Sequence, residues 1–358
     1  MHLEDDARLR RPLVELGGWL MARRLSHSIT DDPNGGFDRP ARRTRPRTKD
    51  RPNYSKAEVG WVVAVDRGRY TCLLDGADEP LIAAKSRTLG RKGVIVGDRV
   101  RLVGDLTGDE GTLARIVEVE ERETVLRRTA DDDDPYERPV VANADQLFIV
   151  TALADPPPRT GMIDRILVAA FDAGIVPILC LTKSDLATPD TLSALYEPLG
   201  VPIVVTQPGS DLDPIREILA DHRTVFIGHS GVGKSTLVNA LIPDADRVTG
   251  EVNEVTGRGR HTSTSAVALE LPPPGGWVID TPGIRSFGLS HVTQDSIIAA
   301  FGDLAELTED CPRGCDHGSQ APECGLDLAV AEGRLTPERL ASFRRMERSW
   351  TERVPGTW

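Results

Sequence analysis

Aromatic residues and cysteines are scarce in this chain of 358 residues, and long hydrophobic runs are missing. Only 4% of the residues are aromatic, and five are cysteines. So few aromatics leave little for stacking on nucleic-acid bases, and five cysteines do not suggest a disulfide framework. No apolar stretch approaches the roughly 18 residues of a membrane span, and the run Leu13–Met21 is too short for a signal or an anchor. We therefore expect a cytoplasmic protein that has no membrane partner.

Charge is distributed unevenly along the chain. The formal net charge is −12, from 43 Lys and Arg against 55 Asp and Glu, which argues against a general attraction to nucleic acid. Residues 1–56, however, hold 13 Lys and Arg against 8 Asp and Glu, a net charge of +5 that leaves −17 for the rest. Most of these basic residues lie among prolines between Arg39 and Lys56. We expect residues 1–56 to be a disordered basic arm that either binds phosphate or acts as a solubilising tail.

Residues 57–129 break into short β-type runs separated by turns. Examples of these runs are Val59–Val65, Tyr70–Leu74, Gly93–Val100 and Leu113–Val119. About five strands in about 70 residues predict a small β-barrel, with the OB-fold as the leading candidate. Such barrels commonly bind oligonucleotides, and a purely structural barrel is the alternative.

The stretch Gly228–Ser235 fits the pattern G-x4-G-K-S of a phosphate-binding loop. A strand pattern precedes it and a helix pattern follows it, which is the context that such a loop requires. In this motif the backbone wraps the phosphates, Lys234 reaches the β and γ oxygens, and Ser235 holds Mg²⁺. We therefore expect a nucleoside triphosphate to bind to Gly228, His229, Ser230, Gly231, Val232, Gly233, Lys234, Ser235 and Thr236.

A second motif follows the phosphate loop. The stretch Trp277–Gly283 is typical of a buried strand that ends in D-x-x-G. In a nucleotide hydrolase, Asp280 would reach Mg²⁺ and the N–H of Gly283 would meet the γ-phosphate. By itself the motif is also an ordinary turn, and its distance from the phosphate loop makes the nucleotide interpretation the better one.

A third motif lies before the phosphate loop. The apolar run Ile175–Leu181 is typical of a parallel strand covered on both faces, and it is followed by Thr182, Lys183, Ser184 and Asp185. An aspartate in this position accepts hydrogen bonds from two N–H groups of guanine that adenine does not offer. The four residues resemble the N-K-x-D signature of GTPases, with Thr182 where asparagine is usual. They favour GTP over ATP.

The order of these motifs is displaced. In an ordinary GTPase the phosphate loop comes first, whereas here the base motif and the segment Val204–Thr206 precede it. We assign Thr206 to the ribose and base edge. The order predicts an α/β fold with a circularly permuted P-loop GTPase domain over residues 130–290. Such a domain can form the same sheet as an ordinary GTPase if the termini of the unpermuted domain were adjacent in space. Helices are expected at Ile163–Ala173, Thr191–Leu199 and Pro214–Ala220.

Near the C-terminus four potential metal ligands lie close together in the sequence. They have the spacing C-x3-C-x-H-x6-C and are Cys311, Cys315, His317 and Cys324. Three thiolates and one imidazole form the ligand set of a closed structural zinc site. A redox pair and three free thiols are the alternatives. We expect a mostly helical zinc-binding subdomain over residues 291–358, whereas Cys72 and Cys180 lie in apolar runs and are expected in the core.

Together, these motifs resemble the ribosome small-subunit-dependent GTPase A family (RsgA, also called YjeQ). The resemblance covers about residues 58–350 and rests also on Ala142–Gln146, Asp164-Arg165 and Arg258–Thr264. It implies an N-terminal OB-fold, a permuted GTPase domain and a C-terminal zinc subdomain. The family usually has four residues between the first two cysteines of the zinc motif and five between the histidine and the last cysteine. This chain has three and six, so the local turn is expected to differ.

The resemblance also implies a function. A member of this family would be a GTP hydrolase that is stimulated by the small ribosomal subunit and acts in late 30S maturation. It would bind 16S rRNA and couple GTP hydrolysis to its own release from the subunit. We expect the protein to act as a monomer. The alternative is an RNA-binding assembly checkpoint factor in which GTP only sets the affinity for the ribosome.

Phosphoryl transfer needs charge neutralisation and an oriented water molecule. Small signalling GTPases place glutamine directly after D-x-x-G, whereas this chain has Ile284, so intrinsic hydrolysis is expected to be slow. His261 is the candidate for positioning the water, and contact with RNA phosphate is its alternative role. Either Thr262 or Thr264 is expected to bind Mg²⁺ when GTP closes this segment.

Overall fold

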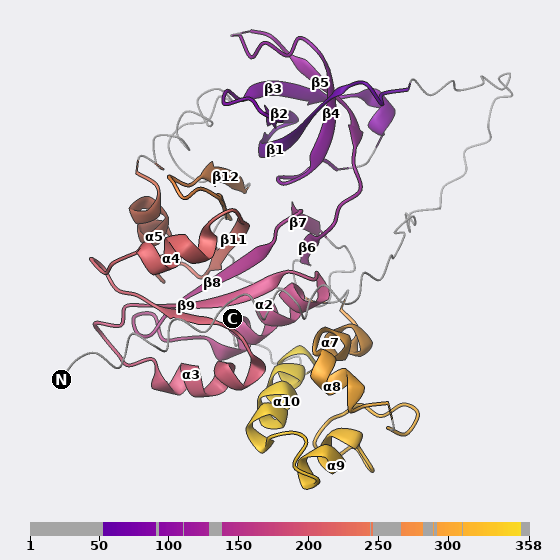
Figure 1. Ribbon diagram of the computed structural model, residues 1–358, viewed down its shortest axis with the longest axis vertical. Coiled ribbons are helices and arrows are strands. Elements are labelled where there is room, and N and C mark those ends of the chain that lie inside the picture. The colour runs from indigo at the N-terminus through magenta and orange to yellow at the C-terminus, as the bar shows by residue number, and fades with distance from the viewer. Residues whose placement is uncertain are drawn as a thin grey trace, which may run out of the picture. The chain divides into compact units, whose positions relative to one another are not determined.

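The computed structural model describes residues 53–90, 93–109, 111–128, 138–243, 245, 266–281, 289, 292–309 and 311–351. The chain divides between Lys56 and Ala57 into two units, and the second unit contains the helices and strands given below (Figure 1). Of the basic arm expected over residues 1–56, only residues 53–56 are described, so that expectation falls almost wholly outside the described residues.

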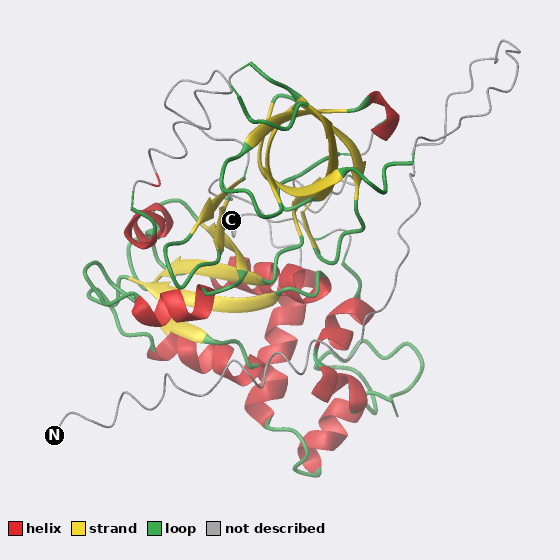
Figure 2. Cartoon of the chain, turned by 45° about the horizontal axis from the view of Figure 1, so that its top comes forward, coloured by secondary structure: helices red, strands yellow, loops and turns green. Residues whose placement is uncertain are grey.

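The first five strands close into a barrel, as the sequence predicts. Their order is β1-β2-β3-β5-β4, and β4 pairs again with β1, so the ring has no free edge (Figure 2). Only β3 and β5 run parallel, and the result is the five-stranded barrel of an OB-fold. Its core contains Val62, Cys72 and Ile116, which have no exposed surface. The strands are β1 (Glu58–Asp66), β2 (Arg69–Leu74), β3 (Leu81–Lys85), β4 (Arg99–Gly104) and β5 (Ala114–Val119), and a short 3-10 helix, η2, spans Arg87–Leu89.

One expected barrel strand is wrong in most of its length. Of the run Gly93–Val100, only the last two residues lie in a strand, β4. The reason is local: Gly97 has a φ of +89°, and the buried carboxylate of Asp98 accepts a hydrogen bond of 2.8 Å from the N–H of Ile95. These features make a tight turn that a hydrophobic pattern does not reveal.

A hairpin connects the barrel to the next domain. Its strands are β6 (Val125–Arg128) and β7 (Arg138–Ala142). After it, the side-chain amide of Asn143 donates to the backbone oxygen of Gly97 at 2.8 Å, and its oxygen accepts from the N–H of Glu123 at 2.8 Å. A Cβ on Gly97 would lie 1.9 Å from the backbone oxygen of Ala142. Gly97 therefore permits a close approach between the barrel turn and the hairpin.

The second domain has a sheet of the permuted GTPase type. Its order is β10-β9-β8-β11-β13-β12, parallel except that β12 runs antiparallel to β13. A single residue pair, Ala64 and Val267, joins β12 to β1 of the barrel. The strands are β8 (Gln146–Ala152), β9 (Val176–Thr182), β10 (Ile203–Val205), β11 (Arg223–Gly228), β12 (Val267–Glu270) and β13 (Trp277–Asp280). The helices are α2 (Thr160–Asp172), α3 (Asp190–Tyr196) with η3 (Glu197–Leu199), α4 (Asp213–Leu219) and α5 (Lys234–Leu241).

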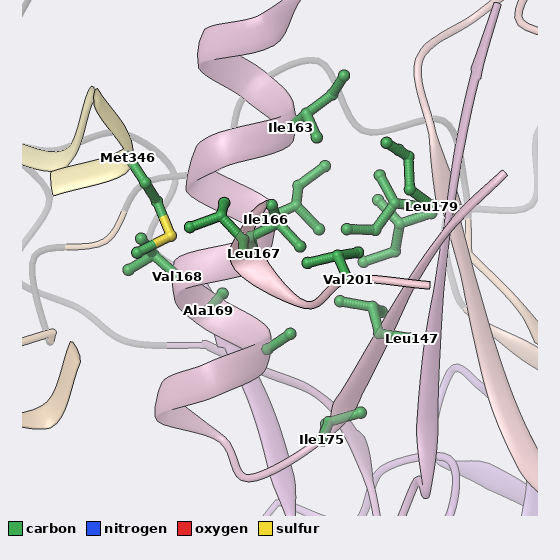
Figure 3. Close-up of a cluster of buried hydrophobic side chains, with 14 of the residues drawn as sticks. Leu147, Ile163, Ile166, Leu167, Val168, Ala169, Ile175, Leu179, Val201 and Met346 are labelled. Carbon is green, nitrogen blue, oxygen red and sulfur yellow. The ribbon is translucent and has the colours of Figure 1, made fainter. Parts of the chain in front are cut away.

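Helices cover both faces of this sheet, which explains the continuous apolar runs of its central strands. Along β8, Leu147 and Ile149 belong to the core shared with α2 and α3. The alternate residues Phe148 and Val150 belong to the core shared with α4 and α5. Figure 3 shows the first core, where α2 directs Ile163 and Ile166 toward the sheet. The three helices expected in this domain are confirmed at α2, α3 and α4.

The C-terminal part is helical, as expected. Its helices are α7 (Gln294–Ala300), α8 (Gly302–Glu306), α9 (Gly325–Ala331) and α10 (Pro337–Thr351). The last helix packs on α2, where Met346 lies against the side that faces away from the sheet (Figure 3). Phe301 links the two, with ring centroids 4.5 Å from Phe171 and 5.6 Å from Phe343. Within the described part of the chain, every helix is too short or too polar to cross a lipid bilayer.

Candidate functional site

The expected phosphate-binding loop lies between β11 and α5. Gly231 and Gly233 have φ values of +84° and +92°, in the left-handed region that glycine adopts without strain. A Cβ on Gly228 would lie 2.7 Å from the backbone oxygen of Val150, so the start of the loop approaches β8 closely. Ser235 is exposed on the first turn of α5. The loop therefore has the strand, turn and helix that a phosphate site requires.

The base motif and the phosphate loop meet at one edge of the sheet. Strands β8, β9 and β11 are parallel, so their carboxyl ends lie together. The hydroxyl of Thr182 donates to the backbone oxygen of Val232 at 2.5 Å and lies 3.2 Å from the backbone oxygen of Thr151. Thr182, which stands where GTPases usually have asparagine, thus ties the base-motif strand to the phosphate loop.

Lys183 and Asp185 lie at the open end of the same strand. The ammonium group of Lys183 donates to the backbone oxygen of Asp155, in the loop before α2. Asp185 is exposed, so its carboxylate is accessible to a ligand. An accessible carboxylate beside the phosphate loop is what recognition of a guanine base needs.

The segment after β10 lies against the base motif. The N–H of Ser184 donates to the backbone oxygen of Thr206 at 3.3 Å, and the hydroxyl of Ser184 lies 3.1 Å from the side-chain oxygen of Gln207. The N–H of Thr206 donates to the backbone oxygen of Leu181 at 2.8 Å. Thr206, which we expected at the ribose and base edge, is therefore beside the base motif.

Lys234 and Asp280 are in direct contact. The buried ammonium group of Lys234 forms an ion pair with Asp280, at the end of β13, and donates to the backbone oxygen of Thr281 at 2.7 Å. The hydroxyl of Thr281 in turn donates to the backbone oxygen of Phe226 at 2.7 Å. The D-x-x-G strand and the phosphate loop are therefore brought together as the sequence predicts, and Lys234 has a carboxylate partner that a phosphate would replace.

Several expected site residues fall outside the described residues. They are the catalytic candidate His261, the magnesium candidates Thr262 and Thr264, and the γ-phosphate contact Gly283. Their roles stay predictions from the sequence.

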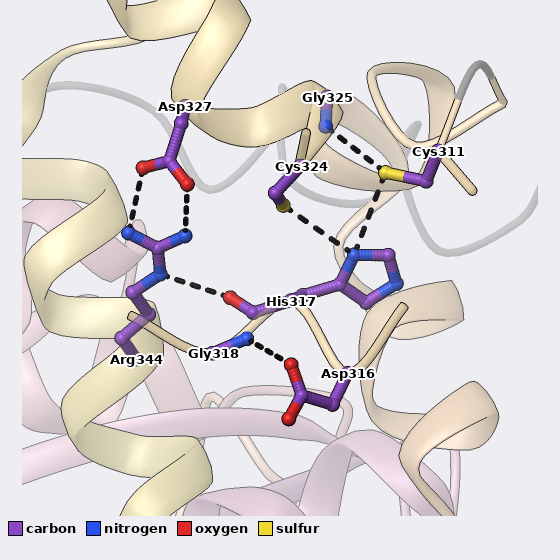
Figure 4. Close-up of polar contacts among 8 residues, drawn as sticks. All are labelled: Cys311, Asp316, His317, Gly318, Cys324, Gly325, Asp327 and Arg344. Carbon is purple, nitrogen blue, oxygen red and sulfur yellow. Dashed lines mark hydrogen bonds and ion pairs between the residues drawn. The ribbon is translucent and has the colours of Figure 1, made fainter. Parts of the chain in front are cut away.

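The four C-terminal ligands converge. Their ligand atoms all lie within 4.8 Å of one another, and Nδ1 of His317 lies 3.7 Å from Sγ of Cys311 and 3.8 Å from Sγ of Cys324 (Figure 4). Zinc–sulfur and zinc–nitrogen bonds of about 2.3 and 2.1 Å at tetrahedral angles would place such atoms about 3.6 Å apart. None of the chain's cysteines is in a disulfide. The donor set and its spacing therefore fit a tetrahedral zinc ion.

Neighbouring groups hold this cluster in shape. The N–H of Gly325 donates to Sγ of Cys311 at 3.1 Å, and a Cβ on Gly325 would lie 2.4 Å from the backbone oxygen of Leu307. The guanidinium group of Arg344 donates to the backbone oxygen of His317 at 2.9 Å and to both oxygens of Asp327 at 2.8 Å (Figure 4). Burial lowers the pKa of His317, which favours the neutral imidazole that a metal requires.

Sequence reasoning missed several residues that complete these sites. It gave no role to Thr151 and Asp155, which offer backbone oxygens to the base motif, or to Arg344 beside the cluster. Backbone oxygens carry no signal in the sequence, because every residue has one. Arg344 lies 17 residues after its partner Asp327, and only the packing of α9 and α10 brings the two together.

Comparison with known sequences yields one family. A sequence model of the family described as RsgA GTPase matches residues 119–290. A protein of Pseudomonas aeruginosa, named small ribosomal subunit biogenesis GTPase RsgA, is 43% identical over 224 residues. That alignment covers 60% of this chain and spans 65% of the length of the relative. A protein of the same name from Alcanivorax borkumensis is 38% identical over 297 residues, which are 78% of this chain and 81% of the relative.

Among the solved structures that are similar to this one are those of YjeQ and YloQ. The crystal structure of YjeQ from Thermotoga maritima has a TM-score of 0.62 and 26% identity, and the match covers 83% of this chain and 99% of that one. The structure of YloQ, described as a circularly permuted GTPase, has a TM-score of 0.59 and 25% identity, over 86% of this chain and 99% of that one.

The strand order, the displaced phosphate loop and the barrel define a circularly permuted P-loop GTPase fold with an N-terminal OB-fold. The identity to the Alcanivorax protein extends over most of both chains. The chain belongs to the RsgA GTPase family.

Proposed function

We propose that the protein is a GTP hydrolase that is stimulated by the small ribosomal subunit and acts in late 30S maturation. The observation that carries the nucleotide part is the hydrogen bond from Thr182 to Val232, which joins a base motif to a phosphate loop. Support for the ribosomal part comes from the relatives, which are named small ribosomal subunit biogenesis GTPases.

The chain's own groups would divide the work of binding. The exposed carboxylate of Asp185 would accept two hydrogen bonds from guanine, and the aliphatic part of Lys183 would stack on the base. Thr206 would lie at the ribose and base edge. The loop from Gly228 to Thr236 would surround the phosphates, and Lys234 would exchange Asp280 for the β and γ oxygens. Adenine would not satisfy Asp185, and this provides the preference for GTP.

Ser235, Asp280 and one of Thr262 and Thr264 would hold the magnesium ion. When bound, the ion would neutralise charge on the phosphates. His261 would orient the attacking water, because Ile284 replaces the glutamine of small signalling GTPases and can neither donate nor accept a hydrogen bond. Without the subunit we expect slow turnover.

The remaining parts would serve the encounter with the subunit. The barrel and the basic arm would contact 16S rRNA, and the Cys311, Cys315, His317 and Cys324 cluster would hold one structural zinc ion. Hydrolysis would be coupled to release of the protein from the subunit. We propose that this takes place in the cytoplasm and that the protein acts as a monomer.

The experiment that tests this function is a GTPase assay with and without isolated small subunits, at two salt concentrations. We expect turnover to rise on addition of subunits and the effect to weaken at high salt, because phosphate contacts depend on salt. ATP should not replace GTP. Turnover that subunits leave unchanged at both salt concentrations would reject the proposed stimulation.

Two variants separate binding from chemistry. Lys234→Ala should remove most GTP binding in calorimetry, and unchanged affinity would reject the nucleotide site. His261→Ala should spare GTP binding and reduce turnover in the presence of subunits, whereas a wild-type rate would exclude its catalytic role.

A non-hydrolysable GTP analogue tests the alternative function. If the analogue fully supports release from the subunit, the protein is instead a checkpoint factor in which GTP only sets the affinity for the ribosome.

A further inference from the structure

Two adjacent arginines on α10, Arg344 and Arg345, contact different parts of the molecule. Arg344 bonds to the loop of the metal cluster through the backbone oxygen of His317. Arg345 bonds to the GTPase domain, where it donates to both carboxylate oxygens of Asp164 on α2 at 2.5 and 2.6 Å. We call Arg344 and Arg345 the arginine pair. Through it, one turn of a single helix touches the surroundings of both candidate sites.

The contact of Arg345 is buried and has several components. The side chain of Asp164 is only 3% exposed. Burial raises the pKa of this carboxyl group, and the charge and hydrogen bonds of Arg345 oppose the rise. Arg345 also donates to the backbone oxygen of Leu195 at 3.1 Å and lies 4.7 Å from the ring centre of Tyr196. Separation of this pair would leave an uncompensated buried charge, so the pair holds α10 against α2. The bond to Leu195 holds α10 against α3 as well.

A second arginine of α10 strengthens this attachment. Arg339 donates to the backbone oxygen of Pro198 in η3 at 2.8 Å, and it pairs with Asp303 of α8 at 2.8 Å. Its guanidinium group also lies 5.2 Å from the ring centre of Phe301. Two separate points of α10 therefore hold the end of α3 and the turn that follows it.

From these contacts a short path leads to the nucleotide site. The hydroxyl of Tyr196 donates to the backbone oxygen of Thr160 at 3.3 Å, in the first turn of α2. That end of α2 reaches the phosphate loop, because Met162 lines one small cavity together with His229 and Val232. The loop that precedes α2 also bonds to the base motif, through Lys183. The position of α10 therefore bears on the positions of both the phosphate loop and the base motif.

We propose that α10 couples the cluster of Cys311, Cys315, His317 and Cys324 to the nucleotide site. A metal ion bound by this cluster would then raise the affinity of the protein for guanine nucleotide. The proposal rests on the proposed function, since it needs both nucleotide and metal to bind. The ion holds the loop that contains His317, the loop holds Arg344, and the same turn of α10 holds α2 and α3 through Arg345. Thermodynamic linkage requires the converse as well: nucleotide must raise the affinity for the metal by the same factor.

The test measures GDP affinity of the full chain by calorimetry, first loaded with zinc and then after chelation, with zinc content determined by mass spectrometry. We expect GDP to bind about 5- to 10-fold more weakly without zinc, at the lower end of usual coupling energies. In the reverse experiment, saturating GDP should raise the zinc affinity, measured by competition with a chelator, by the same factor. Equal GDP affinities with and without zinc would overturn the proposal.

Two variants at matched positions locate the coupling. Arg344→Gln removes the bonds to His317 and Asp327 but leaves Arg345 in place. At full zinc occupancy, its GDP affinity should match that of the zinc-free wild type and should no longer depend on zinc. Arg334→Gln is the control, because the side chain of Arg334 forms an exposed pair with Glu332 in the same module. A normal zinc dependence in Arg344→Gln would also overturn the proposal.

Failure of the proposed function gives a different result. If wild-type protein binds no GDP, or the cluster binds no zinc, the proposed function fails at that site. If GDP and zinc both bind but do so independently, only the coupling is wrong.

Arg345→Lys provides a further check, because lysine keeps the charge beside Asp164 and loses the bond to Leu195. It should weaken GDP binding in the zinc-loaded protein, and an unchanged GDP affinity would show that the coupling does not pass through Arg345.

Discussion

At the scale of single residues, the hydroxyl of Thr182 illustrates how one group can join two motifs. It has one hydrogen to donate and two backbone oxygens within reach, those of Val232 and Thr151. The asparagine that is usual at this position has two N–H groups and would satisfy both oxygens. The link to the phosphate loop therefore persists with threonine.

Replacement of Thr182 by valine tests this link. Thr182→Val keeps the shape but leaves the oxygen of Val232 without its donor, and the absence of a hydrogen bond worth about 1 kcal/mol corresponds to about 5-fold weaker GDP binding in calorimetry. Thr308→Val is the matched control, because Thr308 makes a similar bond of 2.7 Å to Ala305 in the C-terminal helices. Thr182→Asn should bind GDP at least as well as the wild type. Equal affinities in Thr182→Val and the wild type would show that the link does not matter.

The ion pair between Lys234 and Asp280 leads to a second prediction. Asp280 forms an ion pair with Lys234, the lysine that is proposed to bind the phosphates. In the absence of Mg²⁺, Asp280→Asn should therefore strengthen GDP binding by about 5-fold, equivalent to about 1 kcal/mol for a partly exposed pair. With Mg²⁺ present, the same variant should bind GTP more weakly, because the proposed magnesium ligand is removed. Titration calorimetry in chelator and in Mg²⁺ distinguishes the two effects, and the same change under both conditions would contradict them.

At the scale of helices and strands, the periodic patterns of the GTPase domain were enough to predict three of its helices, and the order of its motifs predicted the permuted sheet. The strands of the barrel were harder to predict from the sequence. Strand β3, with the sequence Leu-Ile-Ala-Ala-Lys, was missed because alanine and lysine are uncommon in strands. The expected strand Gly93–Val100 failed because the turn around Gly97 is specified by hydrogen bonds of Asp98 and Asn143, and these partners are known only once the chain has folded.

The start of α9 offers a test of close packing beside the metal cluster. Gly325→Ala would place a methyl group 2.4 Å from the backbone oxygen of Leu307 and 3.2 Å from Sγ of Cys311. Because the backbone must shift, zinc affinity should fall by about 10-fold, the lower end for changes next to metal ligands. Competition with a chelator measures it.

Gly302→Ala is the matched control for that change. Gly302 also begins a helix, α8, and a Cβ there would meet nothing within 4 Å. Zinc affinity should stay at the wild-type value in this variant. If both variants lose affinity equally, the contact with Leu307 and Cys311 is not the cause.

At the scale of the whole molecule, contacts between residues far apart in the sequence decide the arrangement. Thr182 and Val232 are 50 residues apart, and Asp164 and Arg345 are 181 apart. The resemblance to GTPases implied that the two motifs that hold Thr182 and Val232 belong to one site, but it did not imply the bond between them. The second contact had no such guide, because an aspartate in a helix and an arginine in another are common residues that reveal their partner only through packing.

The charge of the chain predicts how its parts would share the proposed binding of rRNA. Residues 1–56 carry a net charge of +5, whereas the rest carries −17. Deletion of residues 2–52 should therefore weaken binding to the small subunit. It should also reduce the salt slope by up to about 4, because each phosphate that the arm neutralises adds about 0.7 to 0.9 to that slope. GDP affinity should not change. Filter binding at several salt concentrations measures the slope, and an unchanged slope would identify the arm as a solubilising tail.

The permuted order of the sheet has a consequence for synthesis of the protein. Domains fold as the chain emerges, from the N-terminus onward. Strands β8 and β9 with the base motif are made first, whereas the phosphate loop at residues 228–235 comes later and Asp280 later still. A nascent chain that stops before β11 would have the proposed surface for guanine but no phosphate loop. Nucleotide would therefore stabilise only a chain whose GTPase domain is finished, and it would act on the last step of folding instead of the first.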